Sequence, residues 1–168
     1  MFFYGGEWYW GVDRLPFLED RLKKLNLRKK ELKSVTKFQK NTSFEKTMDV
    51  SHLKVEYFIS TRSPYTYLAL PEILKLKKNY KINSVIKPLM PMVMRGLPVP
   101  KDKVMYIVKD AKRESSRIGV PFGKIFDPLG DAIERGYSLY PYAKKMNRDG
   151  EYLLEFCRLA WSEGKDMR

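Results

Sequence analysis

The sequence predicts an α/β fold built on two parallel strands that a helix connects, and three observations predict it. In residues 53–60, β-branched and aromatic side chains alternate with other residues in the pattern of a strand. Residues 82–87 have a similar pattern and end at Pro88. Between them, a helical pattern runs from Pro64 to about Asn79. A strand, a helix and a strand of these lengths predict a βαβ unit with parallel strands.

The chain after this unit is expected to be helical. Gly119 is expected to end the first helix, and Pro141 to interrupt the second. Pro71 is expected to bend or break the helix between the strands. The expected helices span residues 102–118, 129–146 and 149–163. In the expected helix 102–118, the residues at helical spacing that are expected to face the core are Met105, Val108, Ala111, Ser115 and Ile118.

The N-terminal residues predict a β-hairpin that is followed by a helix. In residues 2–10, the pair Gly5-Gly6 is a strong turn signal between two aromatic triplets. Asp13 is a candidate cap for the next helix, and Pro16 lies in its expected first turn.

The formal net charge of +13 is concentrated in one part of the chain. Residues 21–46 contain ten lysines and arginines against two glutamates. Residues 28–52 are rich in lysine and polar side chains and have little apolar periodicity, which predicts a solvated linker. A phosphate-binding arm is the alternative. No aromatic stacking pattern accompanies the lysines, so nucleic acid is not the expected partner.

The composition excludes several classes of protein. The 168 residues are 43% hydrophobic, which suits a packed core, but no apolar run of 18 residues predicts a membrane span. The N-terminus lacks the basic and apolar regions of a signal peptide. Cys157 is the only cysteine, so dithiol chemistry is excluded, and we expect a core thiol in a cytoplasmic protein. His52 is the only histidine, so no metal site is expected.

The turn after the first predicted strand is the most informative feature. Ser63 is a good helix N-cap, and Pro64 suits the first helical position. A strand that leads into a helix N-terminus forms an anion site, because free N–H groups and the helix dipole converge there. The run Ser-Pro-Tyr-Thr-Tyr-Leu-Ala from Ser63 to Ala69 resembles the opening of the 2-hydroxychromene-2-carboxylate isomerases. These are relatives of kappa-class glutathione transferases and DsbA-like thioredoxin-fold proteins.

The resemblance implies a thioredoxin-like (DsbA-like) fold with an all-helical insertion, and glutathione as the cofactor. Ser63 would be the catalytic residue, donating a hydrogen bond to the glutathione thiolate at a helix N-terminus that lowers the thiol pKa. Pro64 and Tyr65 would belong to the same cofactor-binding turn. Redox members of the superfamily carry Cys-x-x-Cys where this chain has Ser63 to Thr66. A plain N-cap is the alternative role for Ser63.

A helical face in the second half of the chain also resembles the family. Lys103, Tyr106, Asp110 and Arg113 are spaced so that they share one face of a helix. In the family, this pattern opens the helical insertion that faces the active site. The resemblance implies that these four residues, together with Tyr67, bind substrate. Ordinary charge pairing at the surface is the alternative.

The loop of residues 89–100 precedes this helix. Its methionines, at positions 90, 92 and 94, suit an adaptable apolar wall. Related enzymes often carry here an asparagine that contacts glutathione, whereas this chain has Arg-Gly-Leu-Pro at residues 95–98.

The order of the matching segments is unusual. The run Trp-Gly-Val-Asp-Arg-Leu from Trp10 to Leu15 resembles the carboxyl-terminal end of a family domain, where Asp13 matches a residue near the γ-glutamyl amine of glutathione. The simplest account of this order is a tandem protein of two such domains, and a circular permutation is the other account. The expected parts are 1–27, the end of a first thioredoxin-like copy; 28–52, the basic linker; 53–88, the βαβ start of a second copy; and 89–168, a truncated helical insertion.

Three functional hypotheses follow. In the first, a glutathione-dependent isomerase or transferase acts on a small aromatic carboxylate, whose charge Lys103 and Arg113 neutralise. In the second, a DsbA-family protein keeps the oxidoreductase fold without its redox cysteine pair. In the third, a non-catalytic binding module takes anionic partners through residues 28–52. A homodimer or a swap of segments between two chains is a further expectation.

Overall fold

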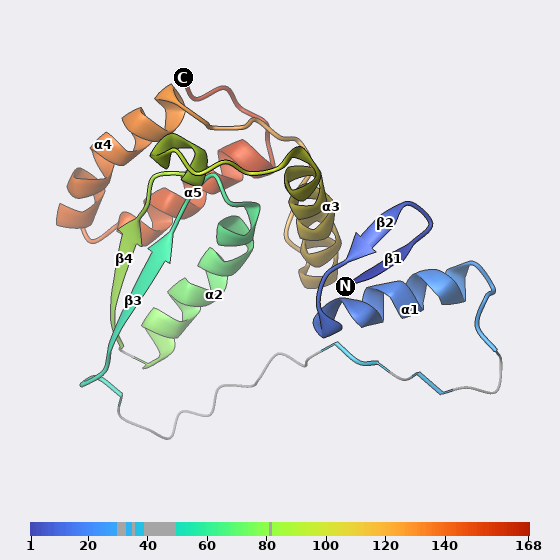
Figure 1. Cartoon of the computed structure of the whole chain (residues 1–168). Helices are drawn as coiled ribbons and strands as arrows, with labels where there is room; N and C mark the ends of the chain where they lie inside the picture. Colours follow the sequence, from blue (N-terminus) through green and yellow to red (C-terminus); the bar gives the residue numbers. More distant parts are fainter. Residues whose placement is uncertain (30–32, 35, 39–49, 81) are drawn as a thin grey trace. The chain divides into compact units, whose positions relative to one another are not determined.

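The computed structural model describes residues 1–29, 33–34, 36–38, 50–80 and 82–168 (Figure 1). It divides into two compact units, Met1–Glu45 and Lys46–Arg168, and contains two two-stranded sheets. Much of the predicted linker 28–52 lies outside the described residues. The boundaries predicted for the parts of the chain therefore stay predictions.

The first unit contains the predicted hairpin and helix. Strands β1 (Phe2–Tyr4) and β2 (Glu7–Tyr9) pair antiparallel. Gly5 and Gly6 form the turn with φ of 53° and 77°, a conformation that favours glycine. Arg21 of helix α1 (Leu15–Lys24) donates to the carbonyls of Tyr4 and Gly5 at 3.2 and 3.0 Å. The helix is thereby tied to the hairpin turn.

The predicted cap of α1 is wrong. Asp13 lies within a short 3₁₀ helix, Val12–Arg14, and Arg14 precedes the first residue of α1 without a side-chain capping bond. Asp13 instead forms an ion pair with Arg14 at 2.8 Å. The extra turn moves the helix start beyond the reach of the aspartate. Pro16 lies in the first turn of α1, as predicted.

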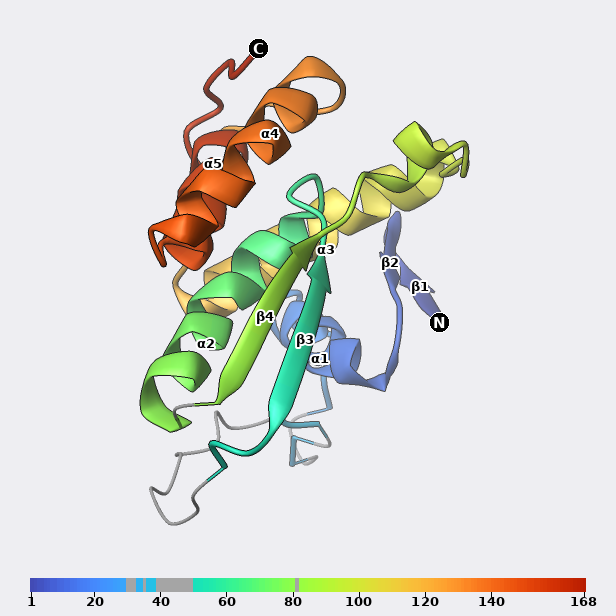
Figure 2. The same cartoon turned by 90° about the vertical axis from the view of Figure 1, so that its left-hand side faces the viewer.

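The second unit begins with the predicted βαβ arrangement. Strands β3 (Lys54–Ile59) and β4 (Asn83–Pro88) are parallel and pair in register from Lys54 opposite Asn83 to Ile59 opposite Pro88. Helix α2 (Pro64–Tyr80) connects them. Figures 1 and 2 both show α2 lying along the strand pair.

Two prolines lie inside helices without ending them, so the predicted interruption at Pro141 is wrong, whereas of the predicted bend or break at Pro71 only the break is excluded. Helix α2 continues through Pro71, and helix α4 (Asp131–Lys145) continues through Pro141. A proline in a helix removes one backbone hydrogen bond. Burial of neighbours such as Leu70 and Ile133, both 0% exposed, stabilises the helices and offsets this loss.

The other helices lie close to their predicted bounds. Helix α3 spans Lys101–Ile118 and ends at Gly119, whose φ is 76°, and helix α5 spans Asp149–Trp161. The predicted buried face of α3 is only partly correct. Met105 and Ile118 are 56% and 36% exposed, whereas Asp110 is fully buried. The buried face of α3 therefore includes the polar residue Asp110 and leaves Met105 exposed.

The core of the second unit joins the inner face of the strand pair to the helices. Its members share near-complete burial and come from β3, β4, α2, α3, α5 and the loop after α3. They are Ile59, Tyr67, Leu68, Leu70, Ile86, Ala111, Phe122, Leu153, Cys157, Ala160 and Trp161. Among the described residues, no helix combines the length and apolarity needed to cross a membrane.

Candidate functional site

The turn between β3 and α2 is held by bonds from two distant helices. The indole N–H of Trp161, on α5, donates to the carbonyl of Thr61 at 3.0 Å. The hydroxyl of Tyr137, on α4, accepts from the amide of Thr61 at 3.1 Å and donates to the carbonyl of Leu89 at 3.1 Å. Helices α4 and α5 therefore hold the carboxyl-terminal ends of both strands in place.

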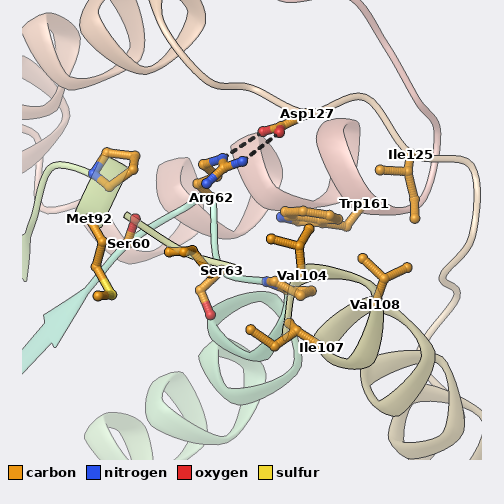
Figure 3. A pocket seen from close by; sticks show the side chains of 13 residues that line it. Ser60, Arg62, Ser63, Met92, Val104, Ile107, Val108, Ile125, Asp127 and Trp161 are labelled. Carbon is orange, nitrogen blue, oxygen red and sulfur yellow. Dashed lines mark hydrogen bonds and ion pairs between the residues drawn. The ribbon is translucent and has the colours of Figure 1, made fainter. Parts of the chain in front are cut away.

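A cavity of about 310 Å³ opens at this end of the strands. Ligands of α/β proteins commonly bind at the carboxyl ends of parallel strands. Most of the lining is apolar, and Figure 3 shows aliphatic side chains of α3 gathered near the Trp161 indole. The lining residues are Ser60, Arg62, Ser63, Pro64, Pro91, Met92, Val99, Val104, Ile107, Val108, Ile125, Asp127 and Trp161.

The cavity's two charged side chains neutralise each other. Arg62 makes a two-pronged ion pair with Asp127, with nitrogen–oxygen distances of 2.9 and 2.8 Å (Figure 3). This hydrogen bonding raises the pKa of Arg62. The Asp127 carboxylate also accepts from the amide of Leu129 at 3.2 Å. A ligand in the cavity therefore meets a paired cation.

Two serines, Ser60 and Ser63, also line the cavity; one precedes Arg62 in the sequence and the other follows it. Ser63 immediately precedes α2, and its carbonyl accepts from the amide of Thr66 at 3.0 Å, as at the start of a helix. The hydroxyl oxygen of Ser60 is buried and has no hydrogen-bond partner in the part of the chain that the structure describes. Leaving a buried hydroxyl unpaired costs about 1–3 kcal/mol, so Ser60 requires an explanation.

The predicted cofactor-binding turn lies partly in the cavity wall. Ser63 and Pro64 line the cavity, next to the N-terminus of α2. Tyr65 points elsewhere, because its hydroxyl donates to the Asp110 carboxylate at 2.7 Å. Tyr65 thus connects α2 to α3.

The residues predicted to bind substrate are not among those that line the cavity. Asp110 is buried beside Arg113, with a nitrogen–oxygen distance of 3.8 Å, so the predicted surface pairing involves a buried carboxylate. Tyr67 is 3% exposed and donates to the carbonyl of Pro121 at 3.1 Å, and burial raises the pKa of its phenol. Lys103 is exposed on α3, and Tyr106 is half-buried.

Asp13 belongs to the first unit, and its side chain is 63% exposed. Its predicted role towards glutathione stays a prediction. Among the residues that the structure describes, no group of three or more His, Cys, Asp or Glu side chains is arranged to hold a metal ion.

Cys157 is a core thiol, as predicted. It is 0% exposed, and burial raises its pKa far above the ordinary value. Because the thiolate is the reactive form, alkylation by iodoacetamide at pH 8 is expected to be at least about 100-fold slower in the native protein than in denaturant. Mass spectrometry of timed samples measures both rates. Equal rates would show that the thiol is accessible in the folded chain.

Sequence reasoning missed several residues of the cavity. Arg62 and Asp127 are 65 residues apart, so no local spacing connects them. Trp161 lies on the apolar face of the expected helix 149–163, but this pattern does not show that the indole lies in a cavity wall. One signal was present, because the methionine-rich loop predicts an apolar wall and Met92 lines the cavity.

Comparisons with known proteins support the predicted fold. No protein-family model and no curated protein matches the chain. Among solved structures, a selenomethionine 2-hydroxychromene-2-carboxylate isomerase matches with a TM-score of 0.51 and 22% sequence identity. The match covers 67% of this chain, and the chain spans 58% of the isomerase. The chain therefore has the thioredoxin-like, DsbA-type fold of that isomerase.

Proposed function

We propose that the chain is a glutathione-dependent isomerase or transferase that acts on a small aromatic carboxylate. The observation that carries this proposal is the position of Ser63, which lines an apolar cavity at the N-terminus of α2. A helix N-terminus and a hydroxyl donor both favour a thiolate over a thiol. The matched structure is an isomerase of an aromatic carboxylate, which supports the same class of reaction.

The thiol of this reaction must come from a cofactor. The sequence has one cysteine, Cys157, and it is buried in the core. Glutathione bound beside Ser63 would supply a thiolate for reversible addition to a substrate double bond, the chemistry that permits rotation about that bond. Thiol–disulfide exchange within one chain needs two cysteines, and the sequence has one. Under the oxidoreductase hypothesis, the chain would therefore share the fold of those proteins but not their redox reaction.

The roles of this chain's residues follow from their positions. Ser63 would donate its hydroxyl proton to the thiolate sulfur, and the amides at the start of α2 would add their partial positive charge. The aliphatic side chains of α3 and the Trp161 indole would exclude water and pack against the substrate ring. The cavity of about 310 Å³ is near the lower end for small-molecule sites, so it suits one ring system beside the thiol.

The proposal is tested by the pKa of the glutathione thiol, measured through the ultraviolet absorbance of the thiolate. Glutathione bound to the native chain is expected to have a thiol pKa at least about one unit below that of the free tripeptide. Ser63→Ala is expected to remove most of this shift, because the hydroxyl donor is lost. Ser63→Thr retains the donor and is expected to retain the shift.

A matched control is Ser138→Ala. Ser138 lies on α4, is exposed and donates only to the carbonyl of Arg135 at 2.7 Å. This variant is expected to bind glutathione as the native chain does. The proposal fails if the native chain does not lower the thiol pKa, or if Ser63→Ala and Ser138→Ala behave alike.

A non-catalytic small-molecule binder is the second candidate. The ion pair of Arg62 with Asp127 favours it, because the cavity then offers an apolar site without a free charge. This candidate predicts binding of aromatic ligands without glutathione and without turnover of 2-hydroxychromene-2-carboxylate. Turnover that depends on glutathione and on Ser63 would contradict it.

A further inference from the structure

Ser60 distinguishes the cavity from an ordinary apolar pocket. It follows the last residue of β3, and its carbonyl accepts from the amide of Ser63 at 2.9 Å. Ser60 lines the cavity, yet its hydroxyl oxygen is buried and has no hydrogen-bond partner among the described residues. Most buried hydroxyls in native proteins have a partner, and for Ser60 a ligand that enters the cavity would supply one.

The charges at the cavity restrict what this partner is. Arg62 is the only cation among the lining residues, and both prongs of its guanidinium are directed to Asp127 (Figure 3). In the proposed function the thiolate occupies the N-terminus of α2, so a carboxylate that entered the cavity would have to displace Asp127 from Arg62 or remain unpaired among apolar side chains. Both outcomes are unfavourable. The part of the substrate that enters is therefore uncharged.

The apolar lining restricts the ligand further. Val104, Ile107 and Val108 lie on α3 near the Trp161 indole, and Met92 lies on the same side of the cavity as Ser60 in Figure 3. This arrangement suits a flat aromatic ring between aliphatic and aromatic surfaces. Ser60 adds a hydrogen-bonding group to this apolar space, separate from Ser63.

From these observations we propose that Ser60 determines specificity by a hydrogen bond to an uncharged hydroxyl or carbonyl oxygen on an aromatic ring buried in the cavity. A serine side chain has three staggered positions, so one rotation about Cα–Cβ turns the buried hydroxyl towards the ligand. In the proposed isomerase or transferase, on which this inference rests for the location of the substrate, the ring enters first. The substrate carboxylate then stays outside the cavity.

Two matched probes test this role. The first, 2-naphthol, carries a hydroxyl, and the second, 2-methylnaphthalene, carries a methyl group of similar size at the same position. Their dissociation constants are measured by NMR titration with the native full chain and with Ser60→Ala. Loss of Ser60 is expected to reduce the preference for 2-naphthol by about 5–10-fold, with little change for 2-methylnaphthalene.

Ser84 provides a control of the same chemistry. Its hydroxyl is also buried and has no partner within the described ranges, but it lies on β4 and does not line the cavity. Ser84→Ala is expected to leave the preference unchanged, which separates a contact with the ligand from the general effect of removing a buried hydroxyl. Thermal unfolding without ligand checks that both variants fold, and a cooperative transition is expected for each.

The inference is overturned if Ser60→Ala keeps the native preference, if Ser84→Ala loses it equally, or if neither probe binds the native chain. Its failure is distinguishable from failure of the proposed function, since the probes need no glutathione. A native preference that Ser60 controls, without any shift of the glutathione thiol pKa, supports this inference and refutes the proposed chemistry. If instead the glutathione thiol pKa is lowered and Ser60→Ala keeps the native preference for 2-naphthol, only the role of Ser60 is refuted.

Discussion

Replacing Trp161 by alanine is expected to lower the free energy of unfolding by about 3–5 kcal/mol, the usual cost of removing a buried tryptophan or phenylalanine side chain. Trp161 is 4% exposed, and its ring stacks on Phe122 with 6.1 Å between ring centroids. Its indole N–H donates to the carbonyl of Thr61. Packing, stacking and one buried hydrogen bond are lost together.

The loss is large compared with the usual stability of a domain, about 5–15 kcal/mol. Urea denaturation followed by circular dichroism measures it. Tyr142→Ala is the control, because Tyr142 is an aromatic residue on α4 that is 67% exposed, and its loss is expected to cost less than about 0.5 kcal/mol. Trp161→Phe should lie between the two, since it keeps much of the packing but loses the hydrogen bond. Equal stability of Trp161→Ala and Tyr142→Ala would contradict the packing described.

Trp161 also connects stability to the proposed site. The same indole that bonds to the turn lines the cavity. Variants of Trp161 are therefore expected to weaken ligand binding even where they remain folded. Trp161→Phe is the useful case, because a ring remains in the wall while the bond to Thr61 is removed.

Replacing Asp110 by alanine is expected to lower the free energy of unfolding by about 3 kcal/mol. The side chain of Asp110 is 1% exposed, accepts from the Tyr65 hydroxyl at 2.7 Å and lies 3.8 Å from Arg113. Its removal takes the acceptor from a half-buried phenol and the counter-charge from a half-buried guanidinium. Urea denaturation of the variant measures the effect.

The partners of Asp110 allow a sharper test. Asp110→Asn retains an acceptor for Tyr65 but removes the charge, so it separates the hydrogen bond from the ion pair. The combination of Tyr65→Phe with Asp110→Ala is expected to cost less than the sum of the single changes, because both remove the same bond. Lys109→Ala, at an exposed neighbour on α3, is the control and should cost less than about 0.5 kcal/mol. Additive costs would show that the bond contributes little.

This network has a consequence for the predicted site. The predicted helix forms, so its spacing places four residues on one face: Lys103, Tyr106, Asp110 and Arg113. Asp110 is buried by contact with Tyr65 of α2, and none of the four lines the cavity. The pattern supports a structural role for Asp110 and Arg113. Substrate binding by this face stays a prediction.

Local patterns were sufficient for most of the secondary structure. The strands, the hairpin and the helix bounds lie close to their predicted positions, because alternation, helical spacing and glycine turns act over a few residues. Apart from the cap of α1, the errors have one physical origin. Pro71 and Pro141 do not end their helices, and α3 buries Asp110 in place of Met105, because tertiary packing outweighs local preference.

By itself, the sequence determined the βαβ unit, the position of Ser63 before a helix, and the absence of a second cysteine. These depend on residue identity and short spacing. Only the tertiary structure decided that Ser60, Arg62, Asp127 and Trp161 meet at one cavity, and that the charge of Arg62 is neutralised there. The physical reason is that these contacts join segments about 65 to 100 residues apart, where chain spacing carries no information about distance.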